Sequence, residues 1–360
     1  MIGLFFSCKK KETIVEVEKE VIVYQEPGYK WKRNIYFDKN FSTTITNSRR
    51  LFDGLILFTT NNYNILYDSA QNKFSAVTQR YSYEKQVRPL ITKEYYLEVN
   101  DYAINIYNTD KINGNVLGYI NGLLLPKNID SNFLAYDFKN NYLSGDLVGN
   151  SNKFVYPYFT KDNKSKYAII KIKKEPTSSS FPDNAIVIDT FKTITNLNYV
   201  STNRLTGVIG NNLFFTCGNN KNYIVNNDLD TIYINSNVYN CIFKVNNLYY
   251  SFCGGVALGG DTKLLSTSDE GLTWQIVSSG LNYQFQNLNY VNVGDKLIAF
   301  YVGQMWEVII NNNTLAIKEL SNDGLDNKLI NAITMSNGRV FVGTNNGVFE
   351  RPFSEFIDYK

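Results

Sequence analysis

The sequence contains no histidine in its 360 residues. Histidine is the commonest general base in enzymes and the commonest protein ligand for metals, so its absence excludes His-dependent hydrolytic and zinc chemistry. Only four cysteines are present, and they are too few and too scattered to form a disulfide framework. No stretch approaches the roughly 20 apolar residues that a membrane-spanning helix requires.

Aromatic residues are abundant, by contrast, and make up 15% of the chain, with 27 Tyr and 23 Phe. Aromatic side chains favour the pleated, half-buried surface of a β-sheet. Asparagine is frequent beside Gly, Asp or another Asn, which is the chemistry of tight turns. The apolar fraction of 44% is ample for a core. The composition therefore predicts an all-β protein.

Charge is close to balanced, with 36 basic and 33 acidic residues. A nucleic-acid-binding protein normally carries a basic stripe, and outside the extreme N-terminus this sequence has none. We therefore predict no nucleic-acid partner, and nothing in the sequence predicts a cofactor.

A repeated pattern occupies the C-terminal half: a strand, a two-residue turn, a strongly apolar strand and a glycine. The intervals between the closing glycines at 218, 254, 303 and 343 are roughly 36, 49 and 40 residues, as expected for four-stranded propeller blades. The turn residues are types that tolerate the positive φ of hairpin turns. The four turn pairs are Gly210-Asn211, Asn246-Asn247, Gly294-Asp295 and Asn337-Gly338.

Fainter copies lie upstream, where Leu55–Thr60, Tyr95–Val99 and Phe154–Phe159 match the second strands of three more blades. Three faint and four clear copies favour a β-propeller of seven four-stranded blades. Six or eight blades are the alternatives, because two intervals between Tyr95 and Leu213 are near 60 residues and have room for an insertion. The segment Pro176–Pro182 is predicted to be an exposed loop.

Closure of the propeller is expected to involve the two ends of the chain, because an open blade would expose a strand edge. A strand over Trp31–Phe37 is predicted to complete the blade built from Leu329–Phe349.

One segment fits a specific pattern, S/T-x-D-x-G-x-T-W, at every defined position: Thr267, Asp269, Gly271, Thr273 and Trp274. It resembles the Asp-box, or BNR repeat, of sialidases, sortilin-type receptors and related propellers. The resemblance implies that Asp269 accepts backbone N–H groups of the turn, that Gly271 gives conformational freedom, and that Trp274 returns into the blade. In these families the motif is structural and lies away from the binding face. We therefore predict no catalytic residue in it.

A sialidase-like activity would need an arginine cluster, a tyrosine nucleophile and an acid. The F/Y-R-I-P motif of that family is absent, and Val87-Arg88-Pro89 matches it only in part. Arg88 is interpreted as an arginine of the propeller rim, with a ligand role as the alternative.

The cysteines allow two interpretations as well. Cys217 and Cys253 occupy equivalent strand ends in successive blades. One interpretation is a disulfide or metal-binding pair, and the other is two small buried residues. Without histidine or a C-x-x-C spacing we predict no metal site. Cys241 is expected near Phe252, on the face opposite Cys253.

The N-terminus resembles a targeting signal. Leu4-Phe-Phe-Ser-Cys8, followed by three lysines, resembles the end of a bacterial lipoprotein signal peptide, in which the cysteine is lipidated. The alternative is an ordinary cysteine near the end of the chain. The predicted organisation is a signal remnant over 1–8, a tether over 9–28, formed as an extended stalk or a lone strand, and a propeller over 29–360. A Lys-rich start and an Asn/Tyr-rich body resemble lipoproteins of Bacteroidetes-type bacteria.

Together these features predict a non-catalytic propeller that is lipid-anchored at Cys8 in the outer membrane and faces the cell surface, with the periplasmic face as the alternative. Its expected partner is another envelope protein, in a complex for transport, secretion or assembly. The alternative is a surface glycan-binding protein or a divergent sialidase-like glycosidase. No ligand-binding residue is predicted.

Overall fold

The structure is a computed structural model of the whole chain. It describes residues 12–17, 20–25, 30–40, 44–52, 54–60, 63–79, 90–91, 95–99, 104–108, 122–124, 126–134, 148–150, 152–162, 164–176, 185–196, 206–217, 221–254, 261–311, 314–325 and 328–360. The chain divides into two compact units. Unit 1 comprises Met1–Ser48 and Asn289–Lys360, and unit 2 comprises Arg49–Leu288.

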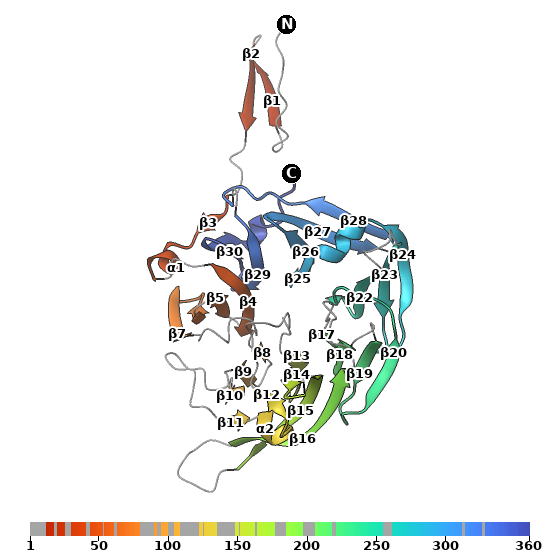
Figure 1. The fold of residues 1–360 in the computed structure, drawn as a ribbon. Coiled ribbons are helices and arrows are strands. Elements are labelled where there is room, and N and C mark those ends of the chain that lie inside the picture. Colours follow the sequence, from red (N-terminus) through yellow and green to blue (C-terminus); the bar gives the residue numbers. More distant parts are fainter. Residues whose placement is uncertain are drawn as a thin grey trace. The chain divides into compact units, whose positions relative to one another are not determined.

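The described residues are almost entirely antiparallel β-sheet, and the sheets follow one another along the chain (Figure 1). The first two sheets after the N-terminal region are formed by β4 (Ile45–Phe52), β5 (Leu55–Thr60), β6 (Tyr63–Asp68) and β7 (Lys73–Gln79), then by β8 (Leu90–Ile91), β9 (Tyr95–Val99), β10 (Ile104–Asn108) and β11 (Gly122–Leu124). A short helix, α2 (Pro126–Ile129), precedes the next sheet, which is formed by β12 (Phe133–Leu134), β13 (Val148–Asn150), β14 (Lys153–Thr160), β15 (Ser165–Glu175) and β16 (Ala185–Asn196).

The later sheets are more regular. Those of unit 2 contain β17 (Thr206–Ile209), β18 (Asn212–Cys217), β19 (Lys221–Val225) and β20 (Thr231–Asn235), then β21 (Phe243–Val245), β22 (Leu248–Cys253), β23 (Thr262–Thr267) and β24 (Gln275–Leu281), followed by the 3₁₀ helix η5 (Tyr283–Asn287). Those of unit 1 contain β25 (Asn289–Val293), β26 (Lys296–Tyr301), β27 (Gln304–Asn311) and β28 (Thr314–Glu319), then β29 (Ile330–Ser336), β30 (Arg339–Thr344), β31 (Gly347–Pro352) and β3 (Lys32–Arg33), with η6 (Phe353–Glu355) after β31.

In five of the four-stranded sheets the strand order follows the chain, so each is a meander of the kind that forms a propeller blade. In the last blade the order is β29-β30-β31-β3, with its fourth strand supplied by the N-terminal segment. The predicted hairpins are present: the four turn pairs of the C-terminal half join the first and second strands of their blades. Gly210, Asn246, Gly294 and Asn337 all have positive φ there. The fold is therefore an all-β propeller, as predicted.

The predicted count of seven four-stranded blades is wrong. Among the described residues, six blades have four strands each, and six is the count that the sequence left as an alternative. The sheet formed by β12–β16 has five strands, because β12 and β13 both pair with β14. This sheet falls in the stretch where the sequence spacing was near 60 residues. A count based on second strands alone does not show whether such a stretch holds an added strand or another repeat.

The N-terminal strand completes the C-terminal blade. Lys32 pairs with Glu350 and Arg33 with Phe349, which confirms the predicted closure between the chain ends. The strand is shorter than predicted because Asn34 caps a helix: its Oδ1 accepts a hydrogen bond of 2.8 Å from the Phe37 N–H. Residues Ile35–Asn40 therefore form α1.

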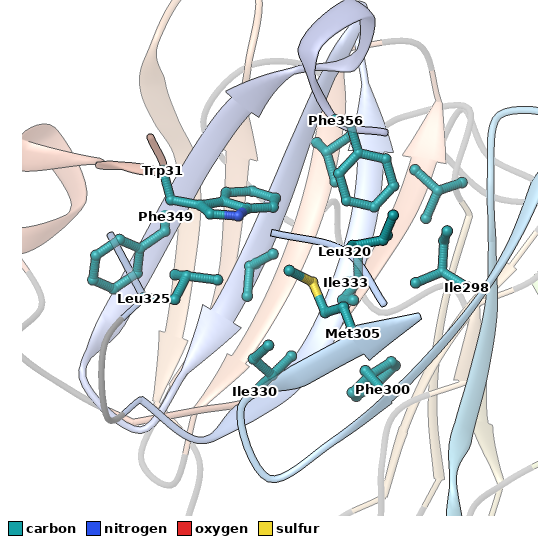
Figure 2. Packing of buried hydrophobic residues seen from close by; sticks show 13 residues of the cluster. Trp31, Ile298, Phe300, Met305, Leu320, Leu325, Ile330, Ile333, Phe349 and Phe356 are labelled. Atoms are coloured by element: carbon teal, nitrogen blue, oxygen red, sulfur yellow. The ribbon is translucent and has the colours of Figure 1, made fainter. Parts of the chain in front are cut away.

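The core of unit 1 gathers around Trp31 (Figure 2). This indole comes from the N-terminal segment and is buried beside Phe349, with Phe356 in edge contact at 5.9 Å between ring centroids. Met305 and Ile333 of the two neighbouring blades belong to the same cluster. Burying one large aromatic side chain contributes about 2–3 kcal/mol, so this single residue ties the N-terminal segment firmly to the last blade.

Upstream of Trp31, β1 (Glu12–Val17) pairs antiparallel with β2 (Glu20–Gln25), whereas the sequence predicted an extended stalk or a lone strand. Cys8 and the rest of the predicted signal remnant lie outside the described residues. Among the helices that the structure describes, none is long and apolar enough to cross a membrane.

Candidate functional site: a groove beside the 267–274 hairpin

The segment 267–274 forms the turn between β23 and β24, and Asp269 is its centre. The Asp269 carboxylate accepts hydrogen bonds from the Thr273 N–H at 2.9 Å and the Thr273 hydroxyl at 2.6 Å. The Thr267 hydroxyl donates to the same carboxylate at 2.7 Å and accepts from the Gly271 N–H at 3.1 Å. The side chains of Thr267, Asp269 and Thr273 thus stabilise the turn.

These contacts also determine the protonation of Asp269. Partial burial alone raises the pKa of the Asp269 carboxyl. The hydrogen bonds from Thr273 and Thr267 to the charged form act in the opposite direction and leave the pKa below its ordinary value. Asp269 is therefore ionised at neutral pH and occupied by its own turn, which argues against a role as a catalytic acid.

The 267–274 hairpin also contacts the preceding blade. The Asn211 N–H donates to the Glu270 carboxylate at 3.4 Å, and the Asn212 side chain donates to the Glu270 carbonyl at 3.3 Å. Gly271 has a φ of +92°, and a Cβ at this position would lie 2.9 Å from the Ile224 side chain. The glycine is thus needed for the turn conformation and for the close approach of two blades.

Trp274 returns from the turn into an aromatic cluster. Its ring centroid lies 5.0 Å from that of Tyr239 and 6.4 Å from that of Phe214. The indole Nε1 donates to the Gly271 carbonyl at 3.1 Å. The ring is only half-buried, because its other side borders a groove.

This interblade groove lies between β20 of one blade and β23–β24 of the next, and its cavity volume is about 420 Å³. Ligand-binding pockets typically measure about 300–1,000 Å³. The groove is lined by Ile234, Asn235, Asn237, Cys253, Lys263, Leu265, Leu272, Thr273, Trp274 and Ile276.

The polar side chains of the groove differ in their hydrogen bonding and exposure. Asn235 is fixed, because its side chain donates to the Tyr239 hydroxyl at 2.9 Å and accepts from the buried Asn222 amide at 2.9 Å. Asn237 is more exposed; its backbone takes part in this network, and its side chain hydrogen-bonds to Tyr239. Lys263 is half-buried and contributes a positive charge. The lining therefore combines an aromatic ring, aliphatic side chains, amides and one cation.

The thiol in the lining is not an activated nucleophile. Burial raises the pKa of Cys253, and the nearby Lys263 only partly offsets this effect. Cys253 and Cys241 are both free cysteines, and burial raises the pKa of Cys241 to about 12. Cys241 lies beside Phe252 as predicted, since the Phe252 backbone hydrogen-bonds to it.

The remaining sequence-derived candidates fall elsewhere. Arg88, the loop residues after Pro176 and the Cys217 side chain lie outside what the structure describes. Within the described part of the chain, no group of three or more Cys, Asp or Glu side chains could hold a metal ion. Sequence analysis missed the groove residues Asn237, Lys263 and Ile276. In the sequence these residues are marked only by lying near Trp274 or in adjoining strands. Neither feature shows that a groove lies between the two blades at this point.

No protein-family model matches the sequence, and no curated protein matches it. Solved structures match in fold, and these neighbours are β-propellers. The β-propeller domain of Cps50 (Swd1) from Myceliophteria thermophila is 8% identical, with a TM-score of 0.48 over 86% of this chain and 96% of that one. BamB from Moraxella catarrhalis is 12% identical, with a TM-score of 0.46 over 85% and 84%. An extracellular domain from B. thetaiotaomicron is 11% identical, with a TM-score of 0.49 over 90% of this chain and 40% of that one. At such identities these likenesses concern the fold and assign no function.

Proposed function

We propose that this protein is a non-catalytic, lipid-anchored binding module that serves as a subunit of an outer-membrane or cell-surface complex for transport, secretion or assembly. The observation that carries the proposal is the make-up of the interblade groove. The titratable side chains in its lining are Lys263 and Cys253, and the raised pKa of Cys253 keeps that thiol protonated at neutral pH. A positive charge beside a neutral thiol and an aromatic ring suits recognition better than bond cleavage.

Exposed apolar side chains on the strands that border the groove favour a protein as its ligand. Leu272 and Ile276 line it and are 42% and 60% exposed, and Tyr233 on β20 is 52% exposed. Protein interfaces have apolar, aromatic centres with polar rims. A partner that covers the two strands would bury these side chains together with the groove.

The membrane attachment rests on the sequence at Leu4–Cys8. Acylation of Cys8 would hold the propeller at a membrane surface without a spanning helix. Mass spectrometry of the N-terminal peptide from the native host tests this part by itself. A lipid-modified cysteine supports the anchor, and an unmodified Cys8 in an otherwise intact N-terminus contradicts it.

Copurification from gently solubilised native membranes tests the binding role. We expect a defined partner to be recovered with the wild-type chain, and we expect the Leu272→Ser/Ile276→Asp variant to lose it. Tyr283→Ser removes a comparably exposed aromatic residue (55%) outside the groove and should retain the partner. Recovery of the wild-type protein alone, as a monomer, contradicts the proposal.

A second candidate function, glycan binding, is favoured by one specific observation. The half-exposed indole of Trp274 borders the groove next to the amides of Asn235 and Asn237. An apolar ring face with amide donors and acceptors suits the apolar faces and hydroxyls of a sugar. A glycan array and a glycosidase turnover screen separate binding from hydrolysis, and the absence of hits in both excludes this candidate.

A further inference from the structure

A second exposed surface lies in unit 1, at the end of its two blades that carries the β26–β27 and β30–β31 turns. These are both turns between second and third strands, and the β28–β29 connection and the segment after β3 reach the same end. This end surface includes Arg33, Ile35, Tyr301, Val302, Lys328, Leu329, Asn345 and Asn346.

Direct contacts join these segments into one surface. Arg33 donates from Nη2 to the Asn346 side chain at 3.3 Å. Asn345 and Leu329 exchange two hydrogen bonds, one through the Asn345 backbone N–H at 3.1 Å and one through its side chain at 3.0 Å. A Cβ on Gly303 would lie 2.6 Å from the Lys328 carbonyl, so the β26–β27 turn abuts the same connection.

Large apolar side chains protrude from these segments into solvent. The exposed fractions are 69% for Ile35, 57% for Val302, 49% for Tyr301 and 45% for Leu329. Val302 is also in an unfavourable backbone conformation, with a φ of +50°, which is a genuine outlier for a β-branched residue. Asparagine or glycine would suit this turn better. The chain therefore keeps a strained, exposed valine at a turn tip, and strain of this kind accompanies functional positions.

Cations lie among these side chains. Lys32 and Arg33 are exposed, and Lys328 is partly exposed. Two carboxylates lie in the same blades: Glu350 pairs with Arg339 at 2.8 Å and lies across the strand pair from Lys32, and Asp323 interacts with Arg351. The end surface thus presents apolar tips together with positive charge.

We propose that this end surface of unit 1 contacts a lipid bilayer directly, with its apolar tips in the interfacial region and its cations at anionic headgroups. The composition of the surface favours a bilayer. Its exposed apolar side chains lie at turns beside cations, and this pairing suits the membrane interface and anionic headgroups. Tyrosine suits the membrane–water boundary because its ring is apolar and its hydroxyl remains hydrated.

The contact does not depend on acylation or on the interblade groove, so it can be tested apart from the proposed function. The full chain carrying Cys8→Ser is mixed with vesicles of phosphatidylcholine and phosphatidylglycerol, or of phosphatidylcholine alone, and the bound fraction is measured by flotation. We expect binding to the mixed vesicles that weakens as salt rises from about 50 to about 500 mM. Arg33→Glu should weaken it by about fivefold or more.

The apolar tips are tested by Tyr301→Ser/Val302→Asn, which we expect to weaken binding at least about tenfold. Asparagine tolerates a positive φ, so the turn should be kept. The control Tyr283→Ser/Phe191→Ser removes exposed rings of unit 2 and should leave binding unchanged, as should Leu272→Ser/Ile276→Asp in the groove. Absence of wild-type binding, or equal losses in the tip and control variants, overturns the proposal. Loss of a copurifying protein in the tip variant, with vesicle binding intact, would assign the surface to a protein partner and also overturn it.

Discussion

The Arg351 guanidinium carbon lies 5.2 Å from the centroid of the Trp31 ring, with the whole Arg351 side chain buried. Arg351 Nε, Nη1 and Nη2 meet no hydrogen-bond acceptor within the described part of the chain. Burial lowers the pKa of Arg351, and the nearby Asp358, Glu355 and Asp323 partly offset this effect. The indole therefore supplies a direct contact for a costly buried charge, and it does so from the opposite end of the sequence.

This relationship predicts coupled stabilities. Trp31→Ala should destabilise the protein by about 3–5 kcal/mol, through lost burial and the cavity that remains. In the Arg351→Met background the loss should be smaller by about 1–2 kcal/mol, because a desolvated cation–π contact is no longer there to be lost. A double-mutant cycle by chemical denaturation measures this coupling. Additivity within about 0.3 kcal/mol would show that the ring does not stabilise the charge.

The same segment predicts how truncations behave. Deleting residues 29–38 removes β3 and Trp31, leaves the β31 edge unpaired, and should lower the thermal midpoint of the whole domain. Deleting residues 9–26 removes only the β1–β2 hairpin and serves as the control, with little expected change. Differential scanning calorimetry distinguishes the two. Equal and small effects would refute closure of the last blade by the N-terminal strand.

The 267–274 hairpin gives a pH-dependent prediction. The pKa of Asp269 is lowered in the folded protein, so its contribution is present above the unfolded pKa of about 4 and is lost as pH falls through the folded value. Asp269→Asn should cost about 1–2 kcal/mol at pH 7, where the carboxylate accepts its hydrogen bonds. The deficit should shrink below pH 4 in urea titrations. Asp295→Asn, at an exposed turn, is the control, and a deficit for Asp269→Asn that is independent of pH would contradict the charged hydrogen bonding.

Lys153 predicts a second pH dependence of stability, in the alkaline range. Its side chain is 1% exposed, and burial, followed by repulsion from Lys171, lowers its pKa to about 8. The ammonium donates to the Val225 carbonyl at 3.3 Å and the Asn227 side chain at 3.1 Å. Because the folded pKa lies below the unfolded value of about 10.4, the unfolded state holds more protons between the two, and stability should rise with pH through that window.

Urea denaturation at pH 7 and pH 9.5 measures this effect. We expect the wild type to gain about 1–2 kcal/mol from Lys153 across the interval. Lys153→Met should lack the gain, because it has no group to titrate. The same pH slope in both proteins would contradict a buried ammonium at this position.

The fold was largely readable from the sequence, since alternating apolar residues and two-residue turns encode each hairpin locally. Asn34 illustrates the limit of prediction from sequence. Its residue type permits both a strand and a helix cap, and the tertiary position of Phe37 decides between them. The added strand β13 was not visible because its three residues, Val148–Asn150, have no distinctive pattern. The groove was hidden for a related reason. Its lining comes from two blades, and the gap between them depends on packing that no short motif records.

The central claim is that the interblade groove binds a partner, and site-specific photo-crosslinking in native membranes tests it most directly. A photoreactive amino acid replaces Ile276 in the groove or, as the control, Tyr283 outside it. We predict one defined adduct from position 276 and none from position 283. No adduct from position 276, or the same adducts from both positions, would contradict a binding role for the groove.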